Sequence, residues 1–431
     1  MRKLILFVTV LFASSAFAQM DNLINLSAEW MRTGARNGAT NSTDIVVYNP
    51  AGLTNLESGL HINLSNQSLF RKPSHSYDLG FGDGLRSFSQ SGSDLFIPAL
   101  YLAYNMKQWS FFGAGYISGG GATMNYPKGS LTTDLIALSA LQSAGGAYMS
   151  AMNQSLKASS MYLTFMGGAA YAVHDKVSFS VGIRSIMAEN SAEGGMTLSS
   201  SPLDLPDMPL SIDFEESASG IGAVVGINFS ISEKMNLSAR YESAVSLNLV
   251  TKQNIDDFGL TVDGQKNRRD LPAMAAIGIG FKPGPAITTY LDFNYYFQKQ
   301  ANWGNSTDAT NQKSYASLAG NAYTLGAGIE FMLTKKFMAS FGGGFTNYLY
   351  GDRDGYYTKL GTFEVMQDDN VNINTGFSFQ ATEKIRINAG YMHTFWKKDQ
   401  NIKALIAQPL DVDVNVNNSL NAIALGIELS F

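Results

Sequence analysis

Apolar and polar residues alternate with a period of two along much of this chain. In the C-terminal stretch NAIALGIELSF, residues 421–431, every second residue from Ile423 to Phe431 is apolar, and the residues between them are small or polar. This period places all the apolar side chains on one face of an extended strand. The same pattern recurs at 177–187, 235–249, 287–297 and 385–396.

Short and long connections alternate between these segments. Short polar turns lie at 174–176, 232–234, 282–286, 334–336 and 382–384. Long connections that are rich in Gly, Asn, Asp and Ser lie at 192–216, 251–271, 300–318, 351–367 and 399–416. Short turns at one end of a sheet and long loops at the other are typical of an up-and-down meander of antiparallel strands.

The alternation and the turns together predict fourteen strands, an even number, as bacterial barrels have. The strands are expected at about 58–70, 95–106, 109–119, 159–173, 177–190, 217–231, 235–250, 271–282, 286–298, 320–333, 337–350, 369–381, 385–397 and 418–431. Many are longer than the roughly 9 to 11 residues that a tilted membrane strand needs, so hairpins should project beyond the bilayer on the long-loop side. A periplasmic β-sandwich or a propeller is the alternative, but both favour shorter strands and connections of mixed length.

Composition agrees with a membrane barrel. The chain has 42 Gly, 12% aromatic residues and only 11 Pro, which is typical of strands and tight turns. Beyond the N-terminal segment there is no apolar stretch of about 18 residues, which excludes a helical membrane protein. We therefore predict an all-β protein in which residues 55–431 form a 14-stranded antiparallel transmembrane β-barrel.

The N-terminus predicts export. Basic Arg2 and Lys3 precede the apolar stretch 4–12, and Ala16-Phe17-Ala18 has the form of a cleavage site, so residues 1–18 are expected to be a signal peptide. The alternative, a buried N-terminal helix, is disfavoured by the basic start and the cleavage site. The chain has no cysteine, and its formal charge of −5 with no basic run predicts no nucleic-acid partner.

One segment breaks the strand pattern. In residues 131–160, Leu131, Leu135, Leu138 and Leu141 recur at helical spacing, and Gly145-Gly146 interrupts them. Thr132 or Thr133 is a candidate N-cap. We predict a helical hairpin in an extracellular loop at about 120–158, whose apolar stripe either packs on the barrel rim or forms a ligand groove.

Residues 19–54 precede the first strand and contain many small and polar residues. A barrel of this size has an interior too wide for side chains alone to fill. The predicted interpretation is an N-terminal hatch, a segment that folds back into the lumen and plugs it, with a turn fixed by Asn49-Pro50 and released by Gly52. An ordinary periplasmic lead-in loop is the alternative.

The run GARNGATNSTDIVVYNPAGL, residues 34–53, resembles the hatch of the FadL family of outer-membrane long-chain fatty-acid transporters, with Asn49, Pro50 and Ala51 at the position of the Asn-Pro-Ala motif of that family. The resemblance covers nearly the whole mature chain: a signal peptide, the hatch, fourteen strands, a helical loop after the third strand and a terminal Phe431. It implies an outer-membrane channel that passively takes up hydrophobic molecules, most of all long-chain fatty acids. It also implies hatch movement and sideways exit at a kink in the third strand.

The third strand of this chain contains Gly113 and Gly115, which are candidates for that kink. A glycine in a barrel strand is equally compatible with an ordinary bend or with an aromatic side chain that packs over it. Strand alternation places Arg184 and Arg240 on the lumen face, where either could bind a ligand carboxylate. The alternative is that these arginines pair with Glu242, with Asp292 or with hatch carboxylates.

We expect no enzyme and no cofactor, because the nucleotide-binding, zinc-protease and hydrolase motifs are absent. The acidic fragments at 352–355 and 411–415 lack the full spacing of a calcium loop.

The predicted location is the outer membrane of a Gram-negative-type bacterium. We expect a monomer that contacts hydrophobic small molecules, outer-membrane lipid and, through Phe431 as an assembly signal, the insertion machinery. The alternative function is a FadL-like barrel that acts as a surface or secretion-partner binding protein. A polar porin is a third possibility.

Overall fold

The computed structural model describes residues 27–80, 84–90, 93–304, 314–361, 363–364, 367–397, 400–407 and 410–431. Within these residues the main element is a 16-stranded antiparallel sheet. Strands β8 and β9 pair with each other and close fourteen of its strands into a ring, and β10 and β11 extend from β8 outside that ring. The predicted signal peptide, 1–18, lies outside the described residues.

The barrel strands follow one another around the ring in chain order, so the predicted up-and-down barrel is confirmed. They are β1 (Gly59–Arg71), β4 (Ser93–Met106), β5 (Trp109–Tyr126), β6 (Ser150–His174), β7 (Val177–Ser199), β8 (Met208–Ser232), β9 (Met235–Glu242), β12 (Met274–Gly284), β13 (Ile287–Tyr296), β14 (Asn321–Met332), β15 (Phe337–Leu349), β16 (Asn370–Gln380), β17 (Ile385–Trp396) and β20 (Ser419–Ser430). Each corresponds to one of the fourteen strands expected from the alternation.

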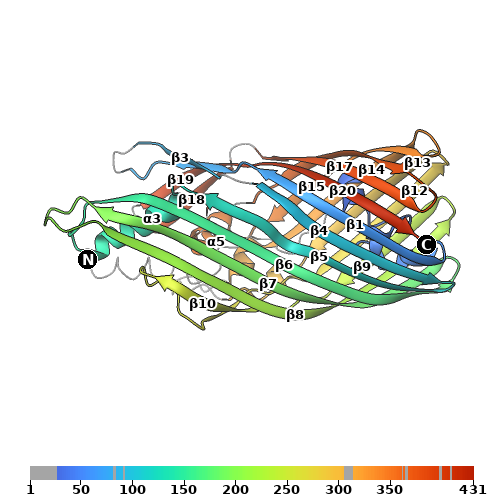
Figure 1. Cartoon of the computed structure of the whole chain (residues 1–431), viewed down its shortest axis with the longest axis horizontal. Helices are drawn as coiled ribbons and strands as arrows, with labels where there is room; N and C mark the ends of the chain where they lie inside the picture. Colours follow the sequence, from blue (N-terminus) through green and yellow to red (C-terminus); the bar gives the residue numbers. More distant parts are fainter. Residues whose placement is uncertain are drawn as a thin grey trace.

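The alternation also predicts the two faces of the wall correctly. On β20, Leu425 is 60% exposed on the outside, whereas Ala424 beside it is fully buried toward the lumen. Strands β6, β7 and β8 are much longer than β12 to β20 and project beyond the others (Figure 1). We call the end with the tight hairpins the short-turn end, and the opposite end the long-loop end. None of the helices in the described part of the chain is long and apolar enough to cross a membrane.

One predicted strand is wrong in its second half. The strand expected at 235–250 ends at Glu242, and the chain then turns inward before β10 (Asn248–Asp256) pairs with β8. Val245 and Leu247 continue the alternation of β9, yet both are fully buried in an apolar cluster with Leu271. The period alone did not distinguish a lipid-facing residue from one that packs inside the barrel.

The helical prediction is also half correct. Helix α3 (Leu131–Ser143) has Ser130, not Thr132 or Thr133, as its N-cap. The helix ends before Gly145 and Gly146, which both have positive φ, and β6 begins soon afterwards at Ser150. The expected second helix of the hairpin is therefore strand.

Smaller elements cover the long-loop end. Strands β10 and β11 lie at this end. A separate four-stranded sheet, in the order β18-β19-β2-β3, also lies there and combines segments from both ends of the chain. The remaining strands are β2 (Ser74–Tyr77), β3 (Arg86–Ser89), β11 (Lys266–Arg268), β18 (Gln400–Ala407) and β19 (Leu410–Asn417). The remaining helices are α2 (Ala28–Thr33), α4 (Tyr315–Ala319), α5 (Arg353–Leu360), η1 (Thr43–Val46), η2 (Pro50–Asn55) and η3 (Gln298–Gln300).

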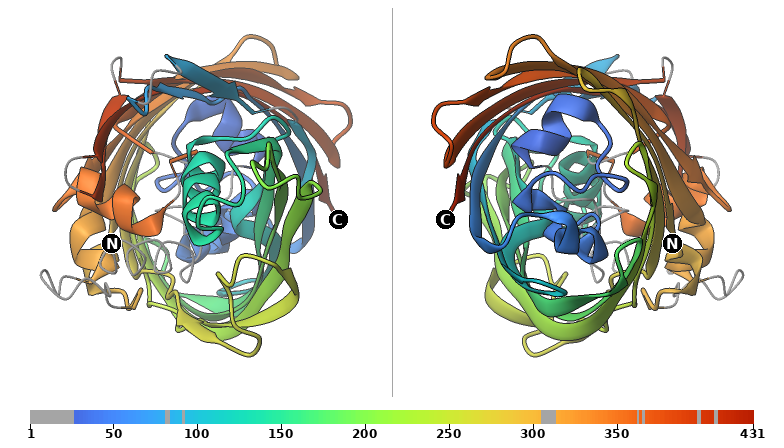
Figure 2. Two further views of the ribbon diagram at one scale, coloured as in Figure 1. Left: turned by 90° about the vertical axis from the view of Figure 1, so that its left-hand side faces the viewer. Right: turned by 90° about the vertical axis from the view of Figure 1, so that its right-hand side faces the viewer.

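Residues 27–56, which we call the N-terminal segment, lie inside the ring toward the short-turn end (Figure 2). The segment contains α2, η1 and η2. Helix α2 contacts β14 to β17 and β20, whereas η2 contacts β4 to β8, so the segment touches strands on opposite sides of the barrel. Residues 19–26 of the expected hatch lie outside the described part of the chain.

Candidate functional site

The side chain of Asn49 holds the N-terminal segment together and fastens it to the wall. Its Nδ2 donates to the carbonyl of Ala39 at 3.0 Å and to Oδ1 of Asn228 on β8 at 2.8 Å. Its Oδ1 accepts a hydrogen bond from the backbone N–H of Gly52 at 3.2 Å. A Cβ on Gly52 would overlap the Asn49 amide, so a larger residue here would displace that amide from its hydrogen bonds.

Pro50 and Ala51 complete the motif. Pro50 is the first residue of η2, where its missing N–H costs no intrahelical hydrogen bond. The carbonyl of Ala51 accepts a hydrogen bond from the hydroxyl of Ser178 on β7 at 2.7 Å. The three motif residues therefore build one rigid turn with attachments to two neighbouring strands.

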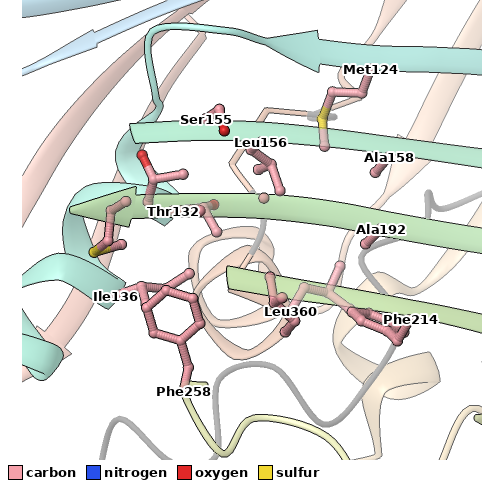
Figure 3. A pocket seen from close by; sticks show the side chains of 15 residues that line it. Met124, Thr132, Ile136, Ser155, Leu156, Ala158, Ala192, Phe214, Phe258 and Leu360 are labelled. Carbon is pink, nitrogen blue, oxygen red and sulfur yellow. The ribbon is translucent and has the colours of Figure 1, made fainter. Parts of the chain in front are cut away.

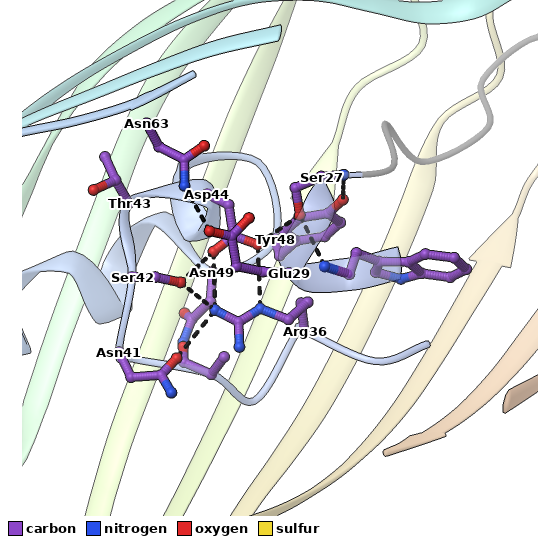
Figure 4. Close-up of polar contacts among 12 residues, drawn as sticks. Ser27, Glu29, Arg36, Asn41, Ser42, Thr43, Asp44, Tyr48, Asn49 and Asn63 are labelled. Atoms are coloured by element: carbon purple, nitrogen blue, oxygen red, sulfur yellow. Dashed lines mark hydrogen bonds and ion pairs between the residues drawn. The ribbon is translucent and has the colours of Figure 1, made fainter. Parts of the chain in front are cut away.

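A buried ion pair organises the middle of the segment (Figure 4). The guanidinium of Arg36 donates to both carboxylate oxygens of Asp44, at 2.9 and 3.2 Å. Asp292 on β13 accepts hydrogen bonds from the backbone N–H groups of Arg36 at 2.6 Å and Asn37 at 2.8 Å. Charge-assisted hydrogen bonds of this kind are stronger than neutral ones, and burial increases the cost of breaking them.

The small residues of the segment allow close backbone contact with the wall. A Cβ on Gly278 of β12 would overlap the backbone nitrogen of Gly38, and a Cβ on Gly342 of β15 would overlap the carbonyl of Thr33. The wall therefore requires glycine at both contacts, and at the first contact Gly38 of the segment is required as well, because a Cβ there would overlap the backbone of Ile279. The sequence pattern showed the small residues of the segment, but not their partners in the wall.

Glu29 in α2 is a buried carboxyl group without a cationic hydrogen-bond partner. Its Oε1 accepts from Nδ2 of Asn63 at 2.7 Å and from Nδ2 of Asn388 at 2.6 Å, whereas Oε2 has no hydrogen-bond partner among the described residues. Burial, with smaller contributions from the charges of Asp44 and Glu428, raises the pKa of Glu29 to about 8. Near neutral pH this side chain is mainly protonated.

The two arginines expected to bind a ligand carboxylate both contact Glu242. Arg184 forms a buried ion pair with Glu242 and donates to the carbonyl of Ser243 at 2.9 Å. Arg240 lies 3.1 Å from the same carboxylate and donates to the carbonyl of Val47 in the N-terminal segment. This geometry matches the alternative in which both arginines pair with Glu242 instead of a ligand. A ligand carboxylate would have to displace Glu242 to bind either guanidinium.

The barrel wall is interrupted between β4 and β5. Their pairing ends at Ala99 and Tyr116. Beyond this point, residues 93–98 remain on β4 beside β1, and residues 117–126 continue along β6. We call the interval between these two stretches the wall window.

Two irregularities and a proline produce this window. The register between β5 and β6 shifts between Ile117 and Gly119, and again between Gly120 and Ala122. Bulges of this kind bend a strand and disrupt its ladder. Gly120 has a φ of +66°, and a Cβ there would overlap the carbonyl of Ser160. On the other side, Pro98 has no N–H to donate across the gap.

A polar contact closes the long-loop end of the window. Oδ1 of Asp94 accepts a hydrogen bond from the backbone N–H of Thr123 at 2.9 Å, and Oδ2 lies 2.5 Å from Nη2 of Arg71. The side chain of Asp94 thus joins β4 to β5 where no backbone hydrogen bond does so. The window is bounded by this contact at one end and by the regular ladder at the other.

A cleft of about 610 Å³ adjoins the window. Phe96, Ile97, Ile117 and Met161 give it an apolar part. Phe96 itself is 76% exposed on the outer face of β4. Serines and the charged side chains of Glu189, Glu215, Glu216 and Lys252 line much of the remainder, so the apolar part lies on the side next to the window.

The kink does not coincide with its expected residues. Gly113 and Gly115 lie in a regular part of the ladder, and the irregularity begins just after them. A Cβ on Gly115 would lie 3.4 Å from the ring of Phe165, which fits the alternative of an aromatic packing over glycine. Pro98, inside a predicted strand, was the signal that could have located the window, because proline in a strand pattern indicates an edge.

The apolar residues of α3 pack on the long-loop end (Figure 3). The cavity below the helix is only about 30 Å³ and is lined by apolar side chains such as Met124, Ile136, Leu156 and Phe214. In this conformation the apolar face of the helix packs on the barrel rim and does not form an open ligand groove. A ligand would enter here only after the helix moved.

Phe431 lies at the short-turn end of the barrel. Its backbone N–H donates to the carbonyl of Leu60 at 2.9 Å, and its side chain is 59% exposed. The exposed ring is accessible to another protein, and its role as an assembly signal stays a prediction.

No protein-family model and no curated protein sequence matches this chain. Solved structures do match over almost its whole length. A FadL homologue from Pseudomonas aeruginosa has a TM-score of 0.70 and 14% identity, and the alignment covers 94% of this chain and 98% of that one. The toluene transporter TodX from P. putida has a TM-score of 0.65 and 11% identity, with 96% and 99% covered. The toluene transporter TbuX from Ralstonia pickettii has a TM-score of 0.58 and 15% identity, with 95% and 99% covered.

These similarities define the class of fold. The chain has the architecture of the FadL-type barrels, so the resemblance predicted from the N-terminal motif is confirmed for the fold. Two of the three similar proteins are described as toluene transporters.

Proposed function

We propose that this protein is an outer-membrane channel for the passive uptake of hydrophobic molecules, in which the N-terminal segment acts as the hatch. The wall window between β4 and β5 is the observation that carries the proposal. A closed barrel with an apolar outer face suits the outer membrane, and a gap in its wall offers an exit that avoids the polar lumen beyond the hatch. Ligand would enter at the long-loop end and leave sideways.

The energetics favour such a sideways exit. Burial is worth about 0.8 kcal/mol per CH₂, so a sixteen-carbon chain is held out of water by on the order of 10 kcal/mol. A molecule that leaves through the wall would pass along the apolar side of the cleft, formed by Phe96, Ile97, Ile117 and Met161, into lipid. A molecule that left through the lumen would have to pass the hydrogen-bonded N-terminal segment.

Long-chain fatty acids are the first ligand class of this proposal, and neutral hydrocarbons are the second. The FadL resemblance supports fatty acids. The pairing of Arg184 and Arg240 with Glu242 supports a neutral ligand, because neither arginine is left to bind a carboxylate alone. Two of the similar structures are described as toluene transporters.

Uptake into liposomes tests the function. Liposomes that contain the purified protein should take up palmitate or toluene faster than protein-free liposomes, while their ion conductance stays low because the lumen is filled. Mass spectrometry of molecules that copurify with the protein would separate the two ligand classes. Equal uptake with and without protein would contradict the proposal, and a large ion conductance would favour a polar porin.

A surface or secretion-partner binding protein is the second candidate. Its support is an exposed apolar region at the tips of the long hairpins, where Met149 is 68% and Leu203 is 66% exposed. A stoichiometric protein partner, recovered without any bound lipophile, would favour this function over transport.

A further inference from the structure

A second cavity, of about 260 Å³, opens at the short-turn end of the lumen. It lies between Asn41 of the N-terminal segment and the three hairpin turns that join β12 to β13, β14 to β15 and β16 to β17. It is separate from the wall window, which involves β4 and β5. The proposed uptake function does not use this cavity.

The cavity has an excess of positive charge. Lys282, Lys335, Lys336 and Arg386 line it, and Glu330 is its carboxylate. Glu330 already forms an ion pair with Arg32 in the N-terminal segment, in which Nη2 of Arg32 lies 3.0 Å from Oε1 of Glu330. Among the described residues, no carboxylate lies within ion-pair distance of the three lysines.

Arg386 is held in place at the wall of the cavity. Its Nε donates to Oε1 of Gln380 at 2.9 Å, and its Nη1 donates to the carbonyl of Asn41 at 3.2 Å. Nη1 also lies 3.4 Å from Oε2 of Glu428, so one carboxylate partly balances the guanidinium. The other carboxylate oxygen of Glu428 accepts from the backbone N–H of Thr43 at 2.7 Å.

The opposite side of the short-turn end is closer to electrical balance, with Lys107 as the lysine that has no acidic neighbour in its turn. Its turns also carry exposed lysines, but Lys176 follows Asp175 and Lys234 follows Glu233. The turns around the cavity contain no acidic residue except Glu383, which does not line it. Positive charge is thus concentrated around one concave site, and such a site focuses its field on small anions.

We propose that this cavity is an oxyanion site that binds a phosphate group, either as free phosphate or as the headgroup of an anionic phospholipid. Lysine ammonium groups bind phosphate as point charges, and an arginine guanidinium matches its oxygens geometrically. Gln380 and Asn41 supply neutral polar groups at the same wall. A phosphate bound to Arg386 competes with the contacts to Asn41 and Glu428, so occupancy weakens the attachment of the N-terminal segment.

Two probes applied to the full-length protein test the site and identify the source of the phosphate. Inorganic phosphate is titrated into detergent-solubilised protein and followed by phosphorus NMR. Phosphatidylglycerol binding is counted by native mass spectrometry, with phosphatidylcholine as the neutral comparison. Binding in the first experiment alone identifies a free anion, and preferential binding of phosphatidylglycerol alone identifies a headgroup.

A charge-matched pair of variants locates the binding. The variant with Lys282→Gln, Lys335→Gln and Lys336→Gln should bind the successful probe about ten-fold more weakly, because three cations are lost from the cavity. The control, with Lys107→Gln, Lys176→Gln and Lys234→Gln, removes the same charge from exposed turn residues outside the cavity and should bind within about two-fold of the wild type. Equal weakening in both variants, or no binding of either probe by the wild type, would overturn the proposal.

Discussion

The Nδ2 atom of Asn49 in the N-terminal segment lies 2.8 Å from Oδ1 of Asn228 on β8, inside the barrel. Asn49 also binds Ala39 and Gly52 within the segment, so this one amide couples the shape of the segment to its attachment. Loss of this one side chain would therefore affect both the shape of the segment and its attachment to the wall.

Asn49→Ala should loosen the segment and raise the ion conductance of the barrel. The lost hydrogen bonds are expected to destabilise docking by about 1–3 kcal/mol, because buried partners remain unsatisfied. Planar-bilayer recordings measure the effect. Asn228→Ala should act in the same direction, and the double variant should show less than the sum of the two effects. Full additivity would contradict a direct coupling between these residues.

Gly278→Ala should displace the segment in a different way. The new methyl group would overlap the backbone of Gly38, and overpacking of this kind typically costs about 1–3 kcal/mol. Limited proteolysis should cut the segment faster than in the wild type. The matched control is Gly284→Ala, because a Cβ at Gly284 meets no atom within 4 Å. Similar cleavage of the two variants would show that the close approach does not hold the segment.

We expect the attachment of the segment to depend on pH through Glu29. Its pKa rises from 4.5 in water to about 8 in the docked segment, chiefly through burial. A raised pKa stabilises docking fully below pH 4.5, and this stabilisation is lost as the pH increases to about 8. Ion conductance should therefore increase over this interval and then level off.

Glu29→Gln is the control for this titration. The amide oxygen can still accept from Asn63 and Asn388, but the side chain carries no ionisable proton. Conductance of this variant should stay low and nearly constant across the same pH interval. A variant that retained the pH dependence of the wild type would assign it to another group.

The sequence predicts the barrel well because the outer face of each strand needs apolar residues and the lumen face needs small or polar ones, which produces a period of two. Leu425 faces outward and Ala424 inward, and β7 and β17 show the same alternation of exposed and buried residues. The alternation is misleading where an apolar residue packs against other apolar residues inside the barrel instead of facing lipid. Val245 and Leu247 keep the period of β9, yet they pack against Leu271 inside the ring.

The sequence predicts less of the site. Asn49-Pro50-Ala51 marks the turn of the N-terminal segment, but Glu29 and the glycines of the wall acquire their roles only through contacts between segments distant in the chain. The kink was expected in the third strand, at Gly113 and Gly115. It lies beyond them because the register of β5 shifts after Ile117, which depends on the pairing partner and not on composition.

The most direct test of the account is the rate of palmitate or toluene uptake into liposomes when the wall window is filled. Ile97→Trp with Ile117→Trp places two large side chains beside the window, whereas Ile183→Trp places one on the lipid-facing side of β7 as a control. If ligand passes through the window, the window variant should lose about ten-fold or more of its uptake rate, and the control should keep the wild-type rate. Undiminished uptake by a correctly folded window variant would contradict passage through the wall.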